Sequence, residues 1–292
     1  TCALPISNGG LVALAGMLAE HFGAIEGASI DANKGAYSSA WMIIFAVIAA
    51  VMVLLGLYHI KMLPSTQVPA TGKKTTSEIM QDLVNVIGNF FTKKHIVYYI
   101  FFIILYRLAE GFIMKVAPLF LRASREVGGL GLSLTEIGTL NGVFGSAAFV
   151  IGSLLGGIFV ARYGLKKTLF MLCCVFNLPF LAYTFLAVVQ PTSLYLIGTC
   201  ITMEYFGYGF GFVGLTLFMM QQIAPGKHQM SHYAFASGIM NLGVMLPGMI
   251  SGYFSDLLGY RSFFIYVLIA TIPAFLMTYF IPFTYDDSKK KK

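Results

Sequence analysis

Three ionisable residues stand in the middle of an apolar stretch at residues 95–121: Arg107, Glu110 and Lys115. A membrane-spanning helix needs roughly 20 mostly apolar residues, and one charge near the bilayer centre costs about 2.5–3.5 kcal/mol. On a helix, Arg107 and Glu110 lie about 60° apart, and Lys115 lies about 80° from Arg107 on the other side. The three charges therefore form one polar stripe that must face protein or water and pair internally.

Two interpretations of this stripe remain open. It can be an ion pair that only packs a helix bundle. It can also belong to a site in a membrane-embedded cavity. In the second case we expect Arg107 and Lys115 to bind anionic groups of a substrate, and Glu110 to balance the charge of Arg107.

Glu204 lies in a second apolar stretch, with no basic residue in the same predicted helix. Desolvation favours the protonated form of such a carboxyl, and proton coupling requires a carboxyl that gains and loses a proton within the membrane. The alternative is a permanently protonated Glu204 that hydrogen-bonds between helices. Tyr208 follows one turn later on the same face. Asn141 and Asn241, amides in other apolar stretches, are predicted as further substrate ligands.

The composition places the chain in a membrane. It is 58% hydrophobic and 11% charged, with a mean hydropathy of +0.79, whereas soluble domains are about 25% charged. The net charge of +7 does not indicate nucleic-acid binding, because the place of each charge relative to the membrane matters more than the sum. The cysteines show no CxxC spacing, and we expect no metal and no cofactor.

The glycine-rich sequence GFGFVG at 209–214 matches the pattern of a dinucleotide site. A real site needs a preceding strand and a downstream acid, and this match lies inside a predicted span. We interpret the longer GYGFGFVG as a helix face thin enough for close packing or bending. GTLNG (138–142) and GSLLG (152–156) likewise have the small-xxx-small spacing of close helix contacts. With no other catalytic motif in the sequence, we expect no enzyme.

The apolar pattern predicts an all-α membrane protein with about eight spans and one amphipathic helix on the membrane surface. Thr75 with Glu78 forms a capping box before the surface helix at 76–91, and Ser133 with Glu136 forms a second one. The predicted spans are about 9–22, 40–60, 95–121, 134–160, 168–189, 194–223, 233–255 and 261–283.

The predicted domains are the remnant of an N-terminal bundle (1–60), a cytoplasmic linker (61–94), a six-helix bundle (95–283) and a basic tail (284–292). Residue 1 is Thr and the first apolar run begins almost at once, so we expect an N-terminally truncated chain in which residues 1–7 are foreign.

The basic residues predict the orientation. Thirteen of the nineteen Lys and Arg residues fall on the side of the 61–94 linker, the 162–167 turn, the 224–232 loop and the C-terminal tail, and four fall on the opposite side. The positive-inside rule makes the first side cytoplasmic. The C-terminus is therefore expected in the cytoplasm.

The turn GIFVARYGLKK at 157–167 resembles the loop signature of the major facilitator superfamily, G-x-L-A-D-R-x-G-R-K-x. The resemblance implies a gating loop, and the alternative is an ordinary basic turn between helices. The matching positions are Gly157, Arg162, Gly164 and Lys166, with Lys167 beside them, and the departures are Ala161 and Leu165 in place of the Asp and second Arg.

Four longer stretches resemble the C-terminal half of AmpG-type muropeptide permeases: LYRLAEGFIMKVAPLFLR, LSLTEIG, TMEYFGYGFG and YAFASGIMNLGVMLPGMISGYF. The family's basic-x-x-acid pair falls on Arg107 and Glu110, and its acid in the tenth helix falls on Glu204. Lys115 is not part of that pattern. The resemblance implies a monomeric major facilitator fold, here truncated to about helices five to twelve, in a bacterial inner membrane.

The same resemblance implies proton symport of anhydromuropeptides for cell-wall recycling, with Glu204 and Glu110 as the proton-coupling acids. Aromatic residues Tyr106, Tyr205 and Tyr208 are candidates for stacking on sugar rings, or for packing alone. The alternatives are a sugar or drug transporter of the same superfamily and a membrane sensor that does not transport. We expect that a chain truncated in this way transports nothing by itself.

Overall fold

A computed structural model describes residues 11, 14–25, 33–62 and 75–285. The described part of the chain is helical and contains no strand, as the composition predicts. By length and composition, five of its helical segments could cross a membrane: Lys34–Met62, Ile96–Arg122, Leu134–Tyr163, Leu165–Val189 and Gln229–Tyr279. The predicted first span is described only in part, and almost all of the predicted tail lies outside the described residues.

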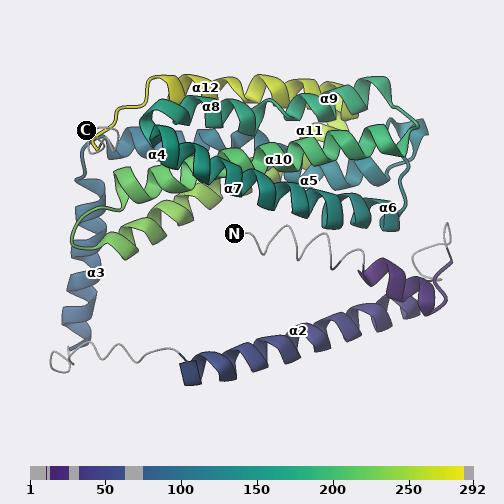
Figure 1. Cartoon of the computed structure of the whole chain (residues 1–292), viewed down its shortest axis with the longest axis horizontal. Helices are drawn as coiled ribbons and strands as arrows, with labels where there is room; N and C mark the ends of the chain where they lie inside the picture. The colour runs from purple at the N-terminus through teal and green to yellow at the C-terminus, as the bar shows by residue number, and fades with distance from the viewer. Residues whose placement is uncertain (1–10, 12–13, 26–32, 63–74, 286–292) are drawn as a thin grey trace.

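Helices α4 to α12 form a bundle that runs along the long axis of the molecule (Figure 1). Helices occupy all six stretches predicted as spans within 95–283, although the third begins earlier, at Leu165, and the last ends earlier, at Tyr279. The α-helices are α4 (Ile96–Tyr106), α5 (Leu108–Arg122), α6 (Leu134–Thr139), α7 (Ser146–Tyr163), α8 (Leu165–Asn177), α9 (Phe180–Val189), α10 (Leu194–Phe218), α11 (Gln229–Ala270) and α12 (Ile272–Tyr279). Three short helices complete the bundle: the 3-10 helix η1 (Arg125–Val127) and the π-helices η2 (Leu140–Gly145) and η3 (Met219–Ile223).

Helix α11 contains a chain reversal and therefore two crossings. Gly259 has φ 70° and ψ 159°, which is not helical. The rings of Phe254 and Tyr266 stack at 5.4 Å with an interplanar angle of 8°. In a continuous helix these two residues would be about 18 Å apart along the axis. The chain thus turns back sharply at Gly259, and Phe112 of α5 packs against both rings.

The glycines of α10 bring three spans into backbone contact. A Cβ atom at Gly209 would lie 2.2 Å from the carbonyl oxygen of Phe149 on α7, and one at Gly211 would lie 2.5 Å from that of Leu172 on α8. On α7, a Cβ atom at Gly152 would lie 2.4 Å from the carbonyl oxygen of Phe206. Only residues without a side chain allow such an approach. The expectation of a thin packing face is confirmed, and the dinucleotide pattern is excluded because it lies inside a helix.

Polar side chains fasten the end of the bundle where α4 begins. Lys93 donates hydrogen bonds to the carbonyl oxygens of Ile223 and Pro225, the second at 2.7 Å, and partial burial lowers the pKa of Lys93. The side chain of Gln222 accepts hydrogen bonds from the backbone N–H groups of Thr284 (2.9 Å) and Tyr285 (3.0 Å) and donates one to the carbonyl oxygen of Tyr285 (2.7 Å). The end of α10 is thereby tied to the segments that precede α4 and follow α12.

Replacing Gln222 with leucine is expected to release the segment after α12. Each lost hydrogen bond contributes about 1 kcal/mol, so the amides of Thr284 and Tyr285 should exchange hydrogen about tenfold faster or more. Hydrogen-exchange mass spectrometry measures this rate. A Thr199→Val variant is the control, because its hydroxyl bonds only within its own helix, to the carbonyl oxygen of Tyr195. Unchanged exchange in Gln222→Leu would show that the segment is held by other contacts.

The N-terminal elements lie around this bundle. Helix α3 (Thr76–Phe91) runs across the end of the bundle, steeply inclined to its spans (Figure 1). Both capping boxes are present: the Thr75 and Ser133 N–H groups each donate to the side chain of the glutamate three residues later, at 2.8 Å. Helix α2 (Lys34–Met62) begins at Lys34, before the predicted start of this span at about residue 40, and is largely exposed.

Candidate functional site

The centre of the site is a buried ion pair at a helix break. Arg107 separates α4 from α5 with φ −104° and ψ 5°. Its guanidinium donates from Nε and Nη2 to the two carboxylate oxygens of Glu110, at 2.6 and 2.5 Å. Arg107 and Glu110 are only 5% and 4% exposed. Such a bidentate pair is strong and geometrically specific, and it confirms the predicted pairing of the two residues.

Residues of α10 cover the pair. The Cζ atom of Arg107 lies 5.1 Å from the centre of the Phe212 ring, a cation–π contact. Tyr208, one turn earlier, lies close enough to interact with both Arg107 and Glu110. Tyr106 is fully buried and donates its hydroxyl to the carbonyl oxygen of Gly211 at 2.9 Å. Tyr106 therefore has no exposed ring surface in this structure, which favours packing over stacking on a sugar.

Glu204 belongs to the same neighbourhood but has a different environment. Part of its side chain remains accessible, while protein atoms surround it closely and it lies within electrostatic range of Glu110. Tyr183, Tyr205 and Tyr208 are further polar neighbours of Glu204. No described residue forms an ion pair with it. The site thus combines one neutralised charge pair with one carboxyl that has no cation beside it.

The depth of these groups follows from helix geometry. Glu204 lies ten residues into α10 and Arg107 lies eleven residues after the start of α4, which is about 15 Å along each axis. Both positions are close to the middle of a hydrocarbon layer about 30 Å thick. The ionisable groups therefore meet near the midplane of the bundle, on two different spans.

Lys115 and Asn241 are exposed, whereas this pair is buried. The side chain of Lys115 passes beside Gly248 of α11, and Asn241 lies two turns before Gly248 on the same face of that helix. The prediction that all three charges pair with one another is wrong for Lys115: among the described residues, only Arg107 and Glu110 form an ion pair. Lys115 lies five residues after Glu110 in the same helix, about 140° around its axis, and this places Lys115 on an exposed face while Glu110 is buried. Whether Lys115 and Asn241 contact a substrate stays a prediction.

Asn141 lies in the π-helix η2, and its side-chain oxygen is buried without a hydrogen-bond partner among the described residues. The same π-helix contains Gly145, where a Cβ atom would lie 3.0 Å from the ring of Tyr205. π-Helical turns are rare and are frequent at functional sites. The unsatisfied oxygen supports Asn141 as a ligand candidate, although the predicted role itself is not tested.

The predicted gating loop lines a cavity. Gly157, Arg162, Gly164 and Lys167 are among the residues around a space of about 500 Å³ at the end of α7. Gly164 has φ 83°, which explains why glycine is required at this turn. Lys166 is exposed beside them. A gating function for these residues remains a prediction.

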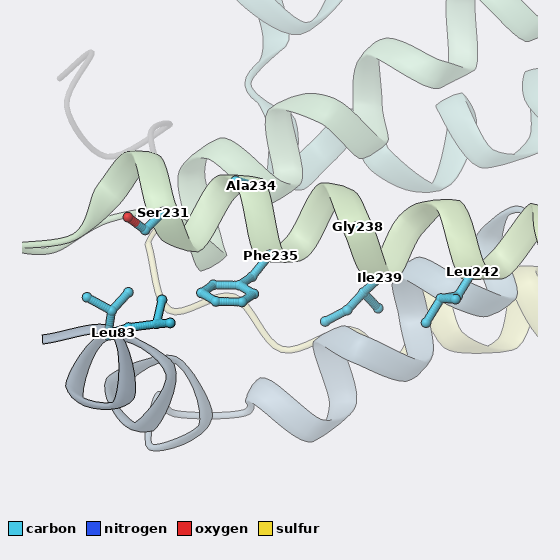
Figure 2. A pocket seen from close by; sticks show the side chains of 8 residues that line it. Leu83, Ser231, Ala234, Phe235, Gly238, Ile239 and Leu242 are labelled. Atoms are coloured by element: carbon cyan, nitrogen blue, oxygen red, sulfur yellow. The ribbon is translucent and has the colours of Figure 1, made fainter. Parts of the chain in front are cut away.

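A second cavity, of about 660 Å³, lies between α3 and the first turns of α11. Figure 2 shows its lining: Leu83 lies beside Phe235, Ile239 and Leu242 lie further along α11, and Ser231 is a polar member. An apolar surface of this kind suits the packing of an amphipathic helix at a membrane surface. Among the described residues, neither cavity is lined by Arg107, Glu110 or Glu204.

Sequence reasoning missed two residues of the site. Phe212 stands one turn after Tyr208, so the helical spacing could have placed it over the same charges. Tyr183 of α9 lies beside Glu204, and no local signal in the sequence joins these two residues. Phe212 could have been predicted from helical periodicity, whereas Tyr183 can be identified only from the packing of two spans that are distant in the sequence.

The family model and the curated relatives that match this chain agree with each other. A family model described as "Major Facilitator Superfamily" matches residues 3–224 and 129–292. The chain is 23% identical over 197 residues to the "Anhydromuropeptide permease" of Escherichia coli (strain K12), covering 68% of this chain and 39% of the permease. It is 24% identical over 220 residues to the "Putative transporter AmpG 1" of Rickettsia conorii, covering 75% of this chain and 50% of that protein. For the protein of the same name in Rickettsia bellii the identity is 23% over 263 residues, covering 90% and 61%. The chain thus spans about two fifths to three fifths of the length of these curated relatives.

Proposed function

The chain belongs to the major facilitator superfamily of membrane transporters, and from this premise we propose that it forms the C-terminal part of a proton-coupled importer of anhydromuropeptides or a related amphiphilic solute. The proposal assigns the inner membrane as the location, with the C-terminus in the cytoplasm. Substrate would bind near the midplane between two helical bundles and gain access to each side by rocking of the bundles.

One observation supports the proposal most directly: Glu204 lies within electrostatic range of the buried Arg107–Glu110 pair. Ionisable groups near the midplane of a membrane protein are expensive and are typical of proton and substrate pathways. Arg107 would attract an anionic group of the substrate. Because Arg107 is paired with Glu110, the bound anion would change the electrostatic potential at Glu204. Protonation of Glu204 and substrate binding would thereby be coupled through one charge network.

The proposed substrate class is inferred from the names of the relatives that match this chain. Proteins named as an anhydromuropeptide permease and as putative AmpG transporters match over much of this chain. The accessible aromatic surface fits a sugar-containing ligand, since Tyr205 and Tyr208 both remain partly exposed next to Glu204. Arg107 supplies a positive charge for a carboxylate of the attached peptide.

The Glu204→Gln substitution tests the proton role. In vesicles that contain the full gene product, an acid-outside pH gradient is expected to concentrate labelled anhydromuropeptide at least tenfold in the wild type and not measurably in the variant. Exchange of labelled for unlabelled substrate without a gradient should persist, because glutamine preserves the shape of the neutral carboxyl. The matched control is Glu126→Gln, an exposed acid in η1, which should accumulate substrate as the wild type does.

Each alternative gives a different result in this assay. Gradient-driven accumulation by Glu204→Gln would remove Glu204 from proton coupling. Binding without accumulation in the wild type would indicate a sensor. Accumulation of sugars or drugs, with no competition by anhydromuropeptide, would overturn the proposed substrate.

A further inference from the structure

The cavity at the end of α7 arises from the way α7 and α10 pack. The two helices touch through backbone atoms at Gly156, where a Cβ atom would lie 2.5 Å from the carbonyl oxygen of Phe210. At the very next residue, Gly157, a Cβ atom would have no atom within 4 Å. Gly157 lies about 100° around the helix from Gly156 and lines a space of about 500 Å³, which has an apolar wall formed by Val160, Val213 and Leu217.

Cationic side chains stand at the mouth of this cavity. Arg162 and Lys167 both line it and both are exposed. Among the described residues, no acidic side chain lines the cavity. The chain reverses at Gly164, so these cations mark the level at which the spans leave the hydrocarbon layer. An apolar wall below two cations at that level matches an amphipathic anion, with its charge at the interface and its apolar part toward the membrane.

The cavity is separate from the proposed transport site. Val213 lies nine residues beyond Glu204 on α10, which is about 14 Å along the helix axis. None of Arg107, Glu110 and Glu204 lines this cavity. On the orientation expected from the distribution of Lys and Arg, this end of the bundle meets the cytoplasmic leaflet, which is the leaflet with a negative surface potential.

We propose that this cavity binds one acidic phospholipid, with its phosphate between Arg162 and Lys167 and its glycerol and upper acyl carbons against Val160, Val213 and Leu217. The site requires the glycine at 157, because any side chain there would project into the space that the lipid occupies. Because Ala161 stands where the loop signature has its Asp, no acid lies between the two cations on this turn.

Native mass spectrometry of the purified full chain tests the site, with phosphatidylglycerol and phosphatidylcholine as probes. The wild type is expected to retain one phosphatidylglycerol in preference to phosphatidylcholine. The Arg162→Gln/Lys167→Gln variant is expected to bind phosphatidylglycerol about 30-fold more weakly, at about a factor of five per lost cation near the membrane surface. Gly157→Leu should lose the bound lipid without losing stability, because leucine meets open space there and favours the helix.

Two controls separate the site from general effects. Gly252→Leu places the same side chain at another helical glycine with no atom within 4 Å, and Lys94→Gln removes an exposed cation elsewhere. Both should bind phosphatidylglycerol as the wild type does. Equal retention of the lipid by Gly157→Leu, or equal binding of both lipids by the wild type, would overturn the proposal. Displacement of the lipid by millimolar glycerol phosphate would show that the cavity takes a soluble phosphate ester instead.

Discussion

Glu110→Ala is expected to destabilise the bundle by about 3–5 kcal/mol, because it leaves the guanidinium of Arg107 buried without its counter-charge. An arginine cannot relieve this cost by losing its proton. Arg107→Ala should cost less, because the remaining carboxyl can become neutral by protonation. The free energy of unfolding in bicelles, measured by steric trapping, gives both values. Glu126→Gln, at an exposed position, should change it by less than about 0.5 kcal/mol.

The double variant Arg107→Met/Glu110→Leu separates structure from function. Apolar residues of similar volume often replace a buried pair without loss of stability, so the double variant should recover most of what Glu110→Ala loses. It should nevertheless fail to bind anhydromuropeptide, since no cation remains for an anionic group. Recovery of both stability and binding would make the pair purely structural. Equal stability of Glu110→Ala and the wild type would contradict the buried pair itself.

Gly209→Ala is expected to destabilise the bundle by about 3 kcal/mol, at the upper end of the usual cost of overpacking. The added Cβ atom would lie 2.2 Å from the backbone oxygen of Phe149. That oxygen cannot move without shifting all of α7, so a change of rotamer gives no relief. The loss should be visible as a lower free energy of unfolding and as aggregation during size-exclusion chromatography.

Gly252→Ala is the matched control for this substitution. It adds the same methyl group to a helical glycine with no atom within 4 Å. Alanine is favoured over glycine in a helix by about 1 kcal/mol, so this variant should be as stable as the wild type or slightly more stable. Similar stability of Gly209→Ala and Gly252→Ala would mean that α7 and α10 do not approach each other as closely as the structure has them.

The spans were predictable because hydropathy is a local property of the sequence. Capping boxes at Thr75 and Ser133 were also predictable, since three-residue spacing is sufficient to identify them. The same applies to the Arg107–Glu110 pair, whose spacing of three residues lets the two side chains meet. These features depend only on residues within one or two turns of one another.

The helix break at Arg107 could not be predicted in the same way. Neighbouring spans hold the chain on both sides of the break: Tyr106 bonds to Gly211 on α10, and Gly111 lies where a Cβ atom would come within 2.3 Å of Pro247 on α11. Those contacts join residues more than 100 positions apart. The link between Gln222 and Tyr285 is similarly non-local. A helical wheel contains none of this information.

The reversal at Gly259 has a consequence for how the protein is made. Because the chain turns back at Gly259 without an extended loop between the last two crossings, we expect the two helices to enter the bilayer together as a hairpin. The polar content of the first, including Asn241, Ser251 and Asp256, is then offset by the more apolar second helix when both leave the translocon. The partitioning of residues 229–279 between water and lipid is consequently a property of the helix pair. The hydropathy of the first helix alone underestimates how readily that helix is inserted.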